Sequence, residues 1–192
     1  SCDLPPSVVR RAIGYGQQNP FLFSTTVGRN VGYALDEPDS GPSLMTIRDA
    51  AREAQILDEV LGLPDGFDTV VGERGVQLSG GQKQRVALAR AFVSDPKLLL
   101  LDDPLSAVDA RTEKAILEAI DRQRAQRGVI LITHRVSAAA RCDRVLVLDQ
   151  GQVVEQGTHD ELVAAGGLYA SFAEEQRIER GLAKLGAEEL PP

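Results

Sequence analysis

The segment Leu78-Ser79-Gly80-Gly81-Gln82-Lys83-Gln84-Arg85 decides how the rest of the chain is interpreted. Ser79 is a preferred residue type for a helix N-cap, and a helix is expected over Gln82–Val93. Gly80 and Gly81 have no side chain, so a ligand can approach the backbone where that helix begins. The first amides of a helix lack a partner within it, and its dipole favours negative charge there, so the segment is typical of an anion site. The alternative is a glycine-rich turn with a helix cap and no ligand.

Short apolar runs that alternate with helices accompany this segment. A helix is expected over Asp109–Gln126. After the last run, Gln150-Gly151 is expected to form a turn into Val153-Val154. Apolar runs alternating with helices predict an α/β fold with a parallel sheet covered on both faces. The runs are Val8–Tyr15, Lys97–Leu101, Val129–Thr133 and Val145–Leu148.

The middle of the chain is mostly helical. Helices are expected over Thr25–Leu35 and Thr46–Leu61, and a loop punctuated by glycines over Leu63–Gln77. We therefore predict a core made of residues 1–18 and 95–176, a helical subdomain of residues 19–94, and a charged tail of residues 177–192.

Polar residues follow three of the predicted strands. Gln17-Gln18 follow the first, Asp102-Asp103 the second and His134 the third. Because ligands bind at the carboxyl ends of strands in an open parallel sheet, these residues are expected to converge on one edge. A carboxylate is a hard oxygen ligand for Mg²⁺, and a second carboxylate can orient or deprotonate an attacking water. Taken singly, each is as consistent with an ordinary structural role; their joint placement favours a magnesium–phosphate site.

In order and spacing, these segments resemble the nucleotide-binding domain of ATP-binding cassette (ABC) proteins, from about Ser7 to Gln176. Leu78–Gln82 resembles the signature motif, and Lys97–Asp103 the Walker B strand. Ser106–Asp109 resembles the D-loop, Ile132–Arg135 contains the residue that matches the switch histidine, and Tyr15–Pro20 resembles the Q-loop. The resemblance implies a P-loop NTPase (RecA-like) parallel-sheet core with a helical signature subdomain.

The resemblance also implies a role for each site residue. Asp102 and Gln18 would act on Mg²⁺, and Asp103 would act as base or water-orienting group. Gln18 and His134 would join it in catalysis, His134 at the γ-phosphate. The signature residues Ser79, Gly80, Gly81 and Gln82 would bind ATP held by the opposite subunit. Asp109 would communicate between the two ATP sites.

Two further segments resemble exporters within this family. Residues Thr69–Gly75 are similar to the loop that touches the coupling helices of the membrane domain, and Gly157–Leu162 is similar to exporter C-termini. The resemblance therefore implies an ATPase subunit of an exporter on the cytoplasmic face of the plasma (inner) membrane. Its partners would be a second nucleotide-binding domain and transmembrane domains, contacted through the Gln18 region and the Thr69–Gly75 loop. A soluble ABC ATPase without a membrane partner is the reading that this loop disfavours.

The chain departs from the family in lacking a Walker A motif, because no Gly-x-x-x-x-Gly-Lys-[Ser/Thr] occurs in its 192 residues. In the family this motif precedes the Q-loop and supplies most of the phosphate contacts. We therefore expect the chain to be a fragment with a core incomplete at its N-terminal side, which alone binds ATP weakly and is inactive. A non-catalytic ABC-like interaction module, or a pseudogene product, is the alternative.

A second departure is Asp103, which stands where the family's catalytic base is normally Glu. Asp is one methylene shorter, and a misplacement of about 1 Å can cost on the order of 100-fold in rate. This resembles the degenerate half of a heterodimeric exporter, in which one site hydrolyses ATP slowly. The alternatives are that Asp103 is a working base or that the pair is a homodimer.

Composition limits the remaining classes. The net charge is −7, with 28 acidic and 21 basic residues, and aromatic residues make up 4%. A nucleic-acid partner is therefore not expected, because phosphate neutralisation requires a basic face and base stacking requires aromatic side chains. Cys2 and Cys142 lack metal-ligand spacing and are expected to be plain thiols. The apolar runs are far shorter than the roughly 20 residues that span a bilayer.

Overall fold

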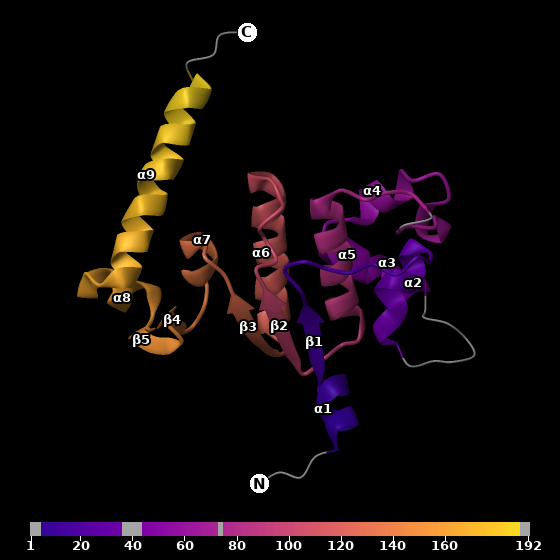
Figure 1. The fold of residues 1–192 in the computed structure, drawn as a ribbon, viewed down its shortest axis with the longest axis horizontal. Coiled ribbons are helices and arrows are strands. Elements are labelled where there is room, and N and C mark those ends of the chain that lie inside the picture. The colour runs from indigo at the N-terminus through magenta and orange to yellow at the C-terminus, as the bar shows by residue number, and fades with distance from the viewer. Residues whose placement is uncertain (1–4, 36–43, 73–74, 189–192) are drawn as a thin grey trace. The chain divides into compact units, whose positions relative to one another are not determined.

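The computed structural model describes residues 5–35, 44–72 and 75–188 of the chain (Figure 1). The chain divides into two compact units, Ser1–Ile132 and Thr133–Pro192. The division into a core of residues 1–18 and 95–176 and a helical subdomain of residues 19–94 stays a prediction. Cys2, the loop 36–43 and the centre of the Thr69–Gly75 loop lie outside the described residues.

The first unit is built on a parallel three-stranded sheet, as predicted. Its strands are β1 (Ile13–Gly16), β2 (Leu98–Asp102) and β3 (Gly128–Ile132), and β2 lies between the other two (Figure 1). Ile13 pairs with Leu98, and Leu98 pairs with Gly128, so the three strands begin in register. Their carboxyl ends therefore meet at one edge, where the predicted polar residues begin.

The two faces of this sheet differ in burial. Leu99 and Leu101 are fully buried on one face, and this face is so close to helix α5 (Gly80–Val93) that a Cβ on Gly14 would collide with the carbonyl of Ala91. On the other face, Ile130 and Ile132 of β3 are 50% and 51% exposed. The prediction of a sheet covered on both faces is therefore wrong for β3 in this chain.

The predicted first strand is shorter than expected, because residues Pro6–Ala12 form helix α1 and only Ile13–Gly16 is extended. Two physical reasons account for the difference. Proline at the first helical position has its φ preset for a helix and gives up no hydrogen bond there. The partner strand β2 begins at Leu98, opposite Ile13, so residues before Ile13 have no strand to pair with.

The predicted helix over Thr46–Leu61 is two helices, α3 (Leu44–Glu53) and α4 (Leu57–Leu61). Gln55 separates them with φ 59°, a left-handed conformation that ends α3. Ile56, next in the chain, is 2% exposed, so the break turns its side chain into the core. The helical spacing of the sequence is continuous across Gln55 and gave no signal for this turn.

The remaining elements of the first unit agree more closely with expectation. The predicted helix over Thr25–Leu35 is α2 (Val27–Val31) followed by a 3-10 turn, η1 (Gly32–Ala34). A second 3-10 turn, η2 (Gly66–Asp68), lies in the predicted glycine-rich loop. The predicted helix over Asp109–Gln126 is α6 (Ala110–Arg124), and α5 begins two residues before its predicted start.

The second unit combines a hairpin with three helices. Strands β4 (Val145–Asp149) and β5 (Gln152–Gly157) are antiparallel and form their own sheet, so the last apolar run does not join the parallel one. The helices are α7 (Val136–Ala139), α8 (His159–Ala165) and α9 (Leu168–Glu188). Gln150 and Gly151 both have positive φ, the conformation of a tight hairpin turn, at the predicted position.

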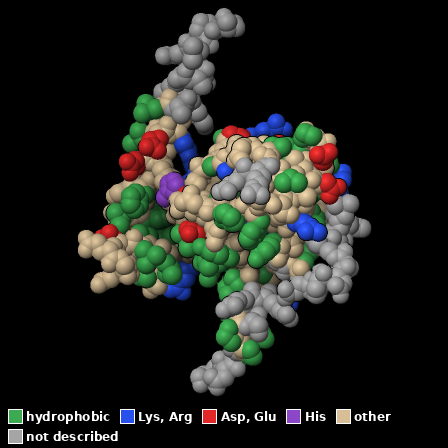
Figure 2. Space-filling model, turned by 45° about the vertical axis from the view of Figure 1, so that its right-hand side comes forward, with side chains coloured by type: hydrophobic (Ala, Val, Ile, Leu, Met, Phe, Trp, Pro, Cys, Tyr) green, Lys and Arg blue, Asp and Glu red, His purple; other side chains and the backbone are tan. Residues whose placement is uncertain are grey.

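The core of the second unit is small. Val145 and Val147 of β4 pack with Leu162 of α8 and Tyr169 of α9. Burial raises the pKa of the Tyr169 phenol, whose oxygen lies 2.9 Å from His159 Nδ1. Hydrophobic side chains outside the cores reach the surface, as Figure 2 shows in green. No helix in the described part of the chain is long and apolar enough to cross a membrane.

Candidate functional site

The turn at Ser79–Gly81 begins α5, and its backbone is held by a reciprocal cap. Gln82 N donates to Ser79 Oγ (3.2 Å), and Ser79 N donates to Gln82 Oε1 (2.8 Å). Such a capping box leaves the amides of the first two helical residues without an intrahelical acceptor. A Cβ placed on Gly80 would have no described heavy atom within 4 Å, so the backbone at Gly80 faces open space. The predicted N-cap is confirmed, and the geometry fits an anion.

A carboxylate from α4 braces this turn. Gln82 Nε2 donates to Glu59 Oε2 at 2.8 Å, and Arg85 Nη1 donates to Glu59 Oε1 and to the carbonyl of Gln55. The break at Gln55 brings both acceptors to α5. Sequence reasoning missed Glu59, because nothing in the spacing of α3 and α4 indicates that they separate.

The two carboxylates predicted at the end of β2 occupy different environments. Asp102 is half-buried within the strand, whereas Asp103 is 5% exposed. Asp103 has φ 42°, and its backbone N donates to the carbonyl of Ile132 at 2.8 Å. A non-glycine residue in this conformation is uncommon outside the Asn and Asp types. Asp103 is therefore held where the chain leaves the sheet.

Gln18 meets Asp103, as the strand-end argument predicted. Its Nε2 lies 3.4 Å from Asp103 Oδ2, although the two residues are 85 positions apart. Gln18 is exposed and follows β1, so the amide reaches the carboxylate from the neighbouring strand. Two of the three predicted strand-end groups are thus in contact.

A third amide, Gln84, joins the signature helix to the loop after Asp103. Its Nε2 donates to the carbonyl of Asp103 (2.8 Å) and to Ser106 Oγ (2.9 Å), and its Oε1 accepts from Ala107 N (3.1 Å). Gln84 is 3% exposed. Sequence reasoning missed this residue. The available signal was its place four residues before Leu88, on the buried side of α5.

Gly81 brings the same two segments together by packing. A Cβ on Gly81 would lie under 3.0 Å from the carbonyl oxygen of Ala107. Gly81 is therefore required because the loop after β2 approaches its backbone closely. At Gly80, by contrast, the backbone faces open space.

Asp109 begins α6 as its N-cap. Its Oδ1 accepts from the backbone amides of Arg111 (2.9 Å) and Thr112 (3.0 Å), and its Oδ2 accepts from Thr112 Oγ1 (2.7 Å). Hydrogen bonds from Thr112, first from its amide and then from its hydroxyl, hold the pKa of Asp109 below its usual value. The exposed carboxylate therefore stays charged at neutral pH.

His134 lies in the second unit, whereas Asp103 and Gln18 lie in the first. Within its own unit its backbone is clamped by α9. Gln176 Nε2 donates to the carbonyl of His134 (2.6 Å), and Gln176 Oε1 accepts from Val136 N (2.9 Å). The His134 side chain is exposed. No pattern in the sequence indicates this role of Gln176, which acts 40 and 42 positions away from its partners.

The described residues include no group of three or more His, Cys, Asp or Glu side chains that could hold a metal ion. Mg²⁺ in phosphate sites is commonly held by one or two carboxylates together with waters and substrate oxygens. Asp102, at the end of β2, supplies a carboxylate of the kind that such a site uses.

The loop predicted to contact a membrane domain is anchored beside the segment that follows Gln18. Val27 N donates to the carbonyl of Thr69 (3.0 Å), and Val71 N donates to the carbonyl of Thr25 (2.9 Å). Two segments singled out separately in the sequence thus lie side by side. Residues 73 and 74 of the loop lie outside the described residues.

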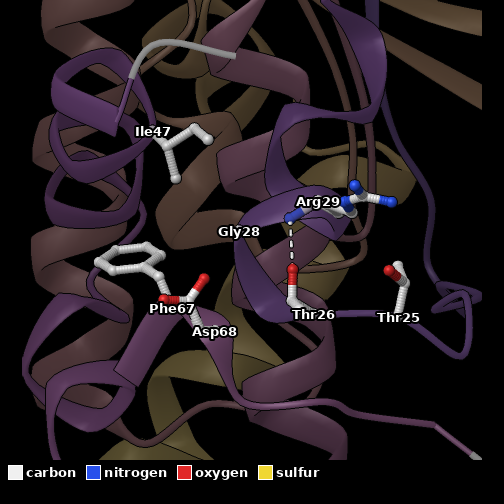
Figure 3. A pocket seen from close by; sticks show the side chains of 7 residues that line it. All are labelled: Thr25, Thr26, Gly28, Arg29, Ile47, Phe67 and Asp68. Carbon is white, nitrogen blue, oxygen red and sulfur yellow. Dashed lines mark hydrogen bonds between the residues drawn. The ribbon is translucent and has the colours of Figure 1, made fainter. Parts of the chain in front are cut away.

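A hollow of about 460 Å³ opens next to these hydrogen bonds (Figure 3). Its walls come from the start of α2, from α3 and from η2, and Thr26 Oγ1 accepts from Arg29 N at its edge. The side chains of Ile47 and Phe67 make one wall apolar. The lining residues are Thr25, Thr26, Gly28, Arg29, Ile47, Phe67 and Asp68.

Comparisons with known proteins agree with this arrangement. The family model described as ABC transporter matches residues 5–106. The mitochondrial potassium channel ATP-binding subunit of Mus musculus is 43% identical over 190 residues, which are 98% of this chain and 26% of that protein. An uncharacterized ABC transporter ATP-binding protein, YfiB, of Bacillus subtilis is 44% identical over 174 residues, covering 91% of this chain and 29% of that protein.

A solved structure of a bacterial Atm1-family ABC exporter with ATP bound superimposes with a TM-score of 0.82 and 44% identity. The match covers 89% of this chain and 30% of that one. The protein described here belongs to the ABC transporter family, and its relatives include ABC exporters. The predicted α/β fold and family are confirmed. The chain spans between a quarter and a third of the length of these three proteins.

Proposed function

We propose that this chain is part of the ATP-binding subunit of an ABC exporter, in which ATP binding and hydrolysis drive transport across a membrane. The observation that carries the proposal is the contact between Gln18 and Asp103 at the edge of the parallel sheet. An amide and a buried carboxylate from adjacent strand ends are suited to orienting a water against a phosphate.

Each predicted site residue keeps a defined task in this proposal. Asp103 orients or deprotonates the attacking water, with Gln18 beside it, and His134 acts on the γ-phosphate. Asp102 and Gln18 would hold Mg²⁺, which, when bound, neutralises charge that develops on the phosphate oxygens.

The signature turn acts on ATP held by a second nucleotide-binding domain. Ser79 and the amides of Gly80 and Gly81 would contact its γ-phosphate. Gln82, predicted to bind the nucleotide, has its side-chain amide engaged by Ser79 N and Glu59, so its contribution includes holding the turn. Asp109 would connect the two ATP sites from the start of α6.

The membrane domains would dock beside α2. Phe21 and Tyr33 are 67% and 65% exposed there, and Arg90 lies under this cluster, with its guanidinium near the rings of Phe23 and Tyr33. Burial lowers the pKa of Arg90. Exposed aromatic side chains of this kind are enriched at protein interfaces. With the anchored Thr69–Gly75 loop, they support contact with the cytoplasmic side of a transporter in the plasma (inner) membrane.

We also propose that Asp103 makes this site a slow one, paired in a heterodimer with a complete site. The test is Asp103→Glu in the full-length transporter with its partner. ATP turnover at this site, measured with the partner's catalytic carboxylate replaced so that the complete site is silent, is expected to rise about tenfold or more, because the longer side chain regains about 1 Å. Asp149→Glu makes the same change at an exposed position and should leave turnover unchanged. Equal turnover for Asp103→Glu and wild type would contradict a degenerate site.

An experiment on the isolated 192 residues tests this proposal against the alternative of a non-catalytic interaction module. We expect them to bind ATP weakly and not to hydrolyse it, because no Walker A motif occurs among them. Micromolar affinity in a nucleotide titration would contradict this expectation. A full-length protein that docks a partner but never turns over ATP would favour the module.

A further inference from the structure

We propose that Gln84 is a positioning residue for hydrolysis, which sets the conformation of Asp103 and ties it to the signature turn of the same subunit. The inference rests on the proposed function of Asp103 as base or water-orienting group. Gln84 stands on α5, five residues after the N-cap Ser79, and its side chain is directed to the loop that follows β2. The Gln84 side chain therefore links α5, the helix that begins with the signature turn, to the segment that contains Asp103.

The hydrogen bonds of Gln84 match an amide and no other side chain of its size. Its Nε2 serves two acceptors, the carbonyl of Asp103 and Ser106 Oγ, while its Oε1 accepts from the backbone of Ala107. A carboxylate at this position could accept but not donate, and an apolar side chain could do neither. Because Gln84 is 3% exposed, water cannot easily replace what is lost.

The carbonyl of Asp103 is the acceptor that matters most for the carboxylate. Asp103 has φ 42°, in the left-handed region that side chains seldom occupy, so its conformation must be maintained by its surroundings. Gln84 fixes the peptide that follows Asp103, and Ile132 fixes the amide that precedes it. The same carbonyl also accepts longer bonds from Ser106 N (3.4 Å) and Ser106 Oγ (3.3 Å). The bonds of Gln84 and Ile132 are the shortest at Asp103, and together they set the direction of the Cα–Cβ bond, and hence where the carboxylate points.

The same helix carries the signature turn at its start. Gly81 lies against the carbonyl of Ala107, three residues before Gln84, so α5 touches the acid loop by packing and by hydrogen bonds. A shift of the signature turn when it meets the partner's ATP would therefore move the loop of Asp103. In the proposed function, a subunit supplies Asp103 to one ATP site and its signature turn to the second. Gln84 makes the position of Asp103 at the first site depend on whether the signature turn is bound to ATP at the second.

The test measures kcat and KM for ATP at the Asp103 site of the full-length transporter, with the partner's catalytic carboxylate replaced so that its complete site is silent. Gln84→Met keeps length but removes the amide, and Gln84→Glu keeps shape but removes the donors. Both are expected to lower kcat about tenfold or more, because a displacement of about 1 Å can cost on the order of 100-fold. KM should stay within about twofold, since no nucleotide contact is changed. Gln126→Glu, at an exposed position after α6, is the matched control and should change neither constant.

A purely structural role predicts a different pattern. It would raise KM together with the loss of kcat, and a raised KM in the folded Gln84 variants, with both constants unchanged in Gln126→Glu, overturns the inference. The Asp103→Glu background adds a second criterion. Gln84→Met should remove most of the gain that Asp103→Glu gives, and a full gain retained in the double variant overturns the inference.

Amide hydrogen exchange tests the role of Gln84 by a readout that does not depend on ATP hydrolysis. In Gln84→Met, amides of residues 103–107 should exchange at least about tenfold faster than in wild type, and unchanged exchange overturns the inference. Absence of ATP hydrolysis by the wild-type transporter contradicts the proposed function and leaves this readout standing. If Gln84→Met fails to fold, Ser106→Ala removes one of the three bonds of Gln84, together with the 3.3 Å bond from Ser106 Oγ to the Asp103 carbonyl. A loss of kcat of about threefold is then expected, and no loss overturns the inference.

Discussion

Two glutamines hold the backbone of two candidate catalytic segments in the same manner but in different surroundings. Gln84 of α5 is buried and donates a hydrogen bond to the carbonyl of Asp103. Gln176 of α9 is half-buried and donates a hydrogen bond to the carbonyl of His134. A hydrogen bond that water can replace contributes little net stability, and one that leaves a buried group unsatisfied costs more when removed. The comparison indicates that the acid loop is rigidly set and the histidine segment is held more loosely.

The largest effect is expected where packing reinforces the buried clamp. Gly81→Ala forces a methyl group against the Ala107 carbonyl and should lower the free energy of unfolding by about 2 kcal/mol. Gly80→Ala is the matched control one residue away, where the methyl group meets open space, and should change it by less than about 0.5 kcal/mol. Urea denaturation of the chain measures both, and equal effects would show that the loop does not press on α5.

The glutamine pair itself gives the next effect. Gln84→Leu removes the amide from three hydrogen bonds at a buried position and should cost about 1–1.5 kcal/mol, whereas Gln176→Leu should cost less than about 1 kcal/mol. Hydrogen exchange of residues 103–107 and 134–136 reports each loop separately. If Gln176→Leu opens its loop as strongly as Gln84→Leu, the distinction between a rigid and a loose segment is wrong.

The smallest effect concerns two capping boxes with different chemistry. In the first unit Gln82 closes the box on Ser79, and in the second Glu161 closes it on Thr158. The Thr158 amide, followed by its hydroxyl, lowers the pKa of Glu161 from 4.5. The charged cap is therefore fully effective above about pH 4.5 and is lost as the pH falls through the lowered pKa.

The amide exchange protection of the first turn of α8 should thus decrease between pH 5 and pH 3, after correction for intrinsic exchange rates. The protection of the first turn of α5 should not decrease over this range. Glu161→Gln should remove the pH dependence of α8. A dependence that persists in Glu161→Gln would assign it to another group.

Much of this molecule could be predicted from the order of its motifs. The parallel pairing, the cap at Ser79 and the contact between Gln18 and Asp103 follow from local patterns and from the rule that strand ends meet at one edge. The break at Gln55 could not be predicted, because a left-handed residue inside a helical pattern leaves no periodic signal. Glu59, Gln84 and Gln176 were missed for a related reason, since each acts across a long sequence separation that only packing creates.

The open face of β3 has a practical consequence for the chain in solution. Ile130 and Ile132 present half of their surface side by side on an edge strand, which is the arrangement that recruits other strands. The net charge of −7 opposes such association through repulsion between molecules. Salt screens that repulsion, so the colloidal stability of the chain is expected to decline as ionic strength rises. A nucleotide titration on these residues is therefore best performed at low salt and low protein concentration.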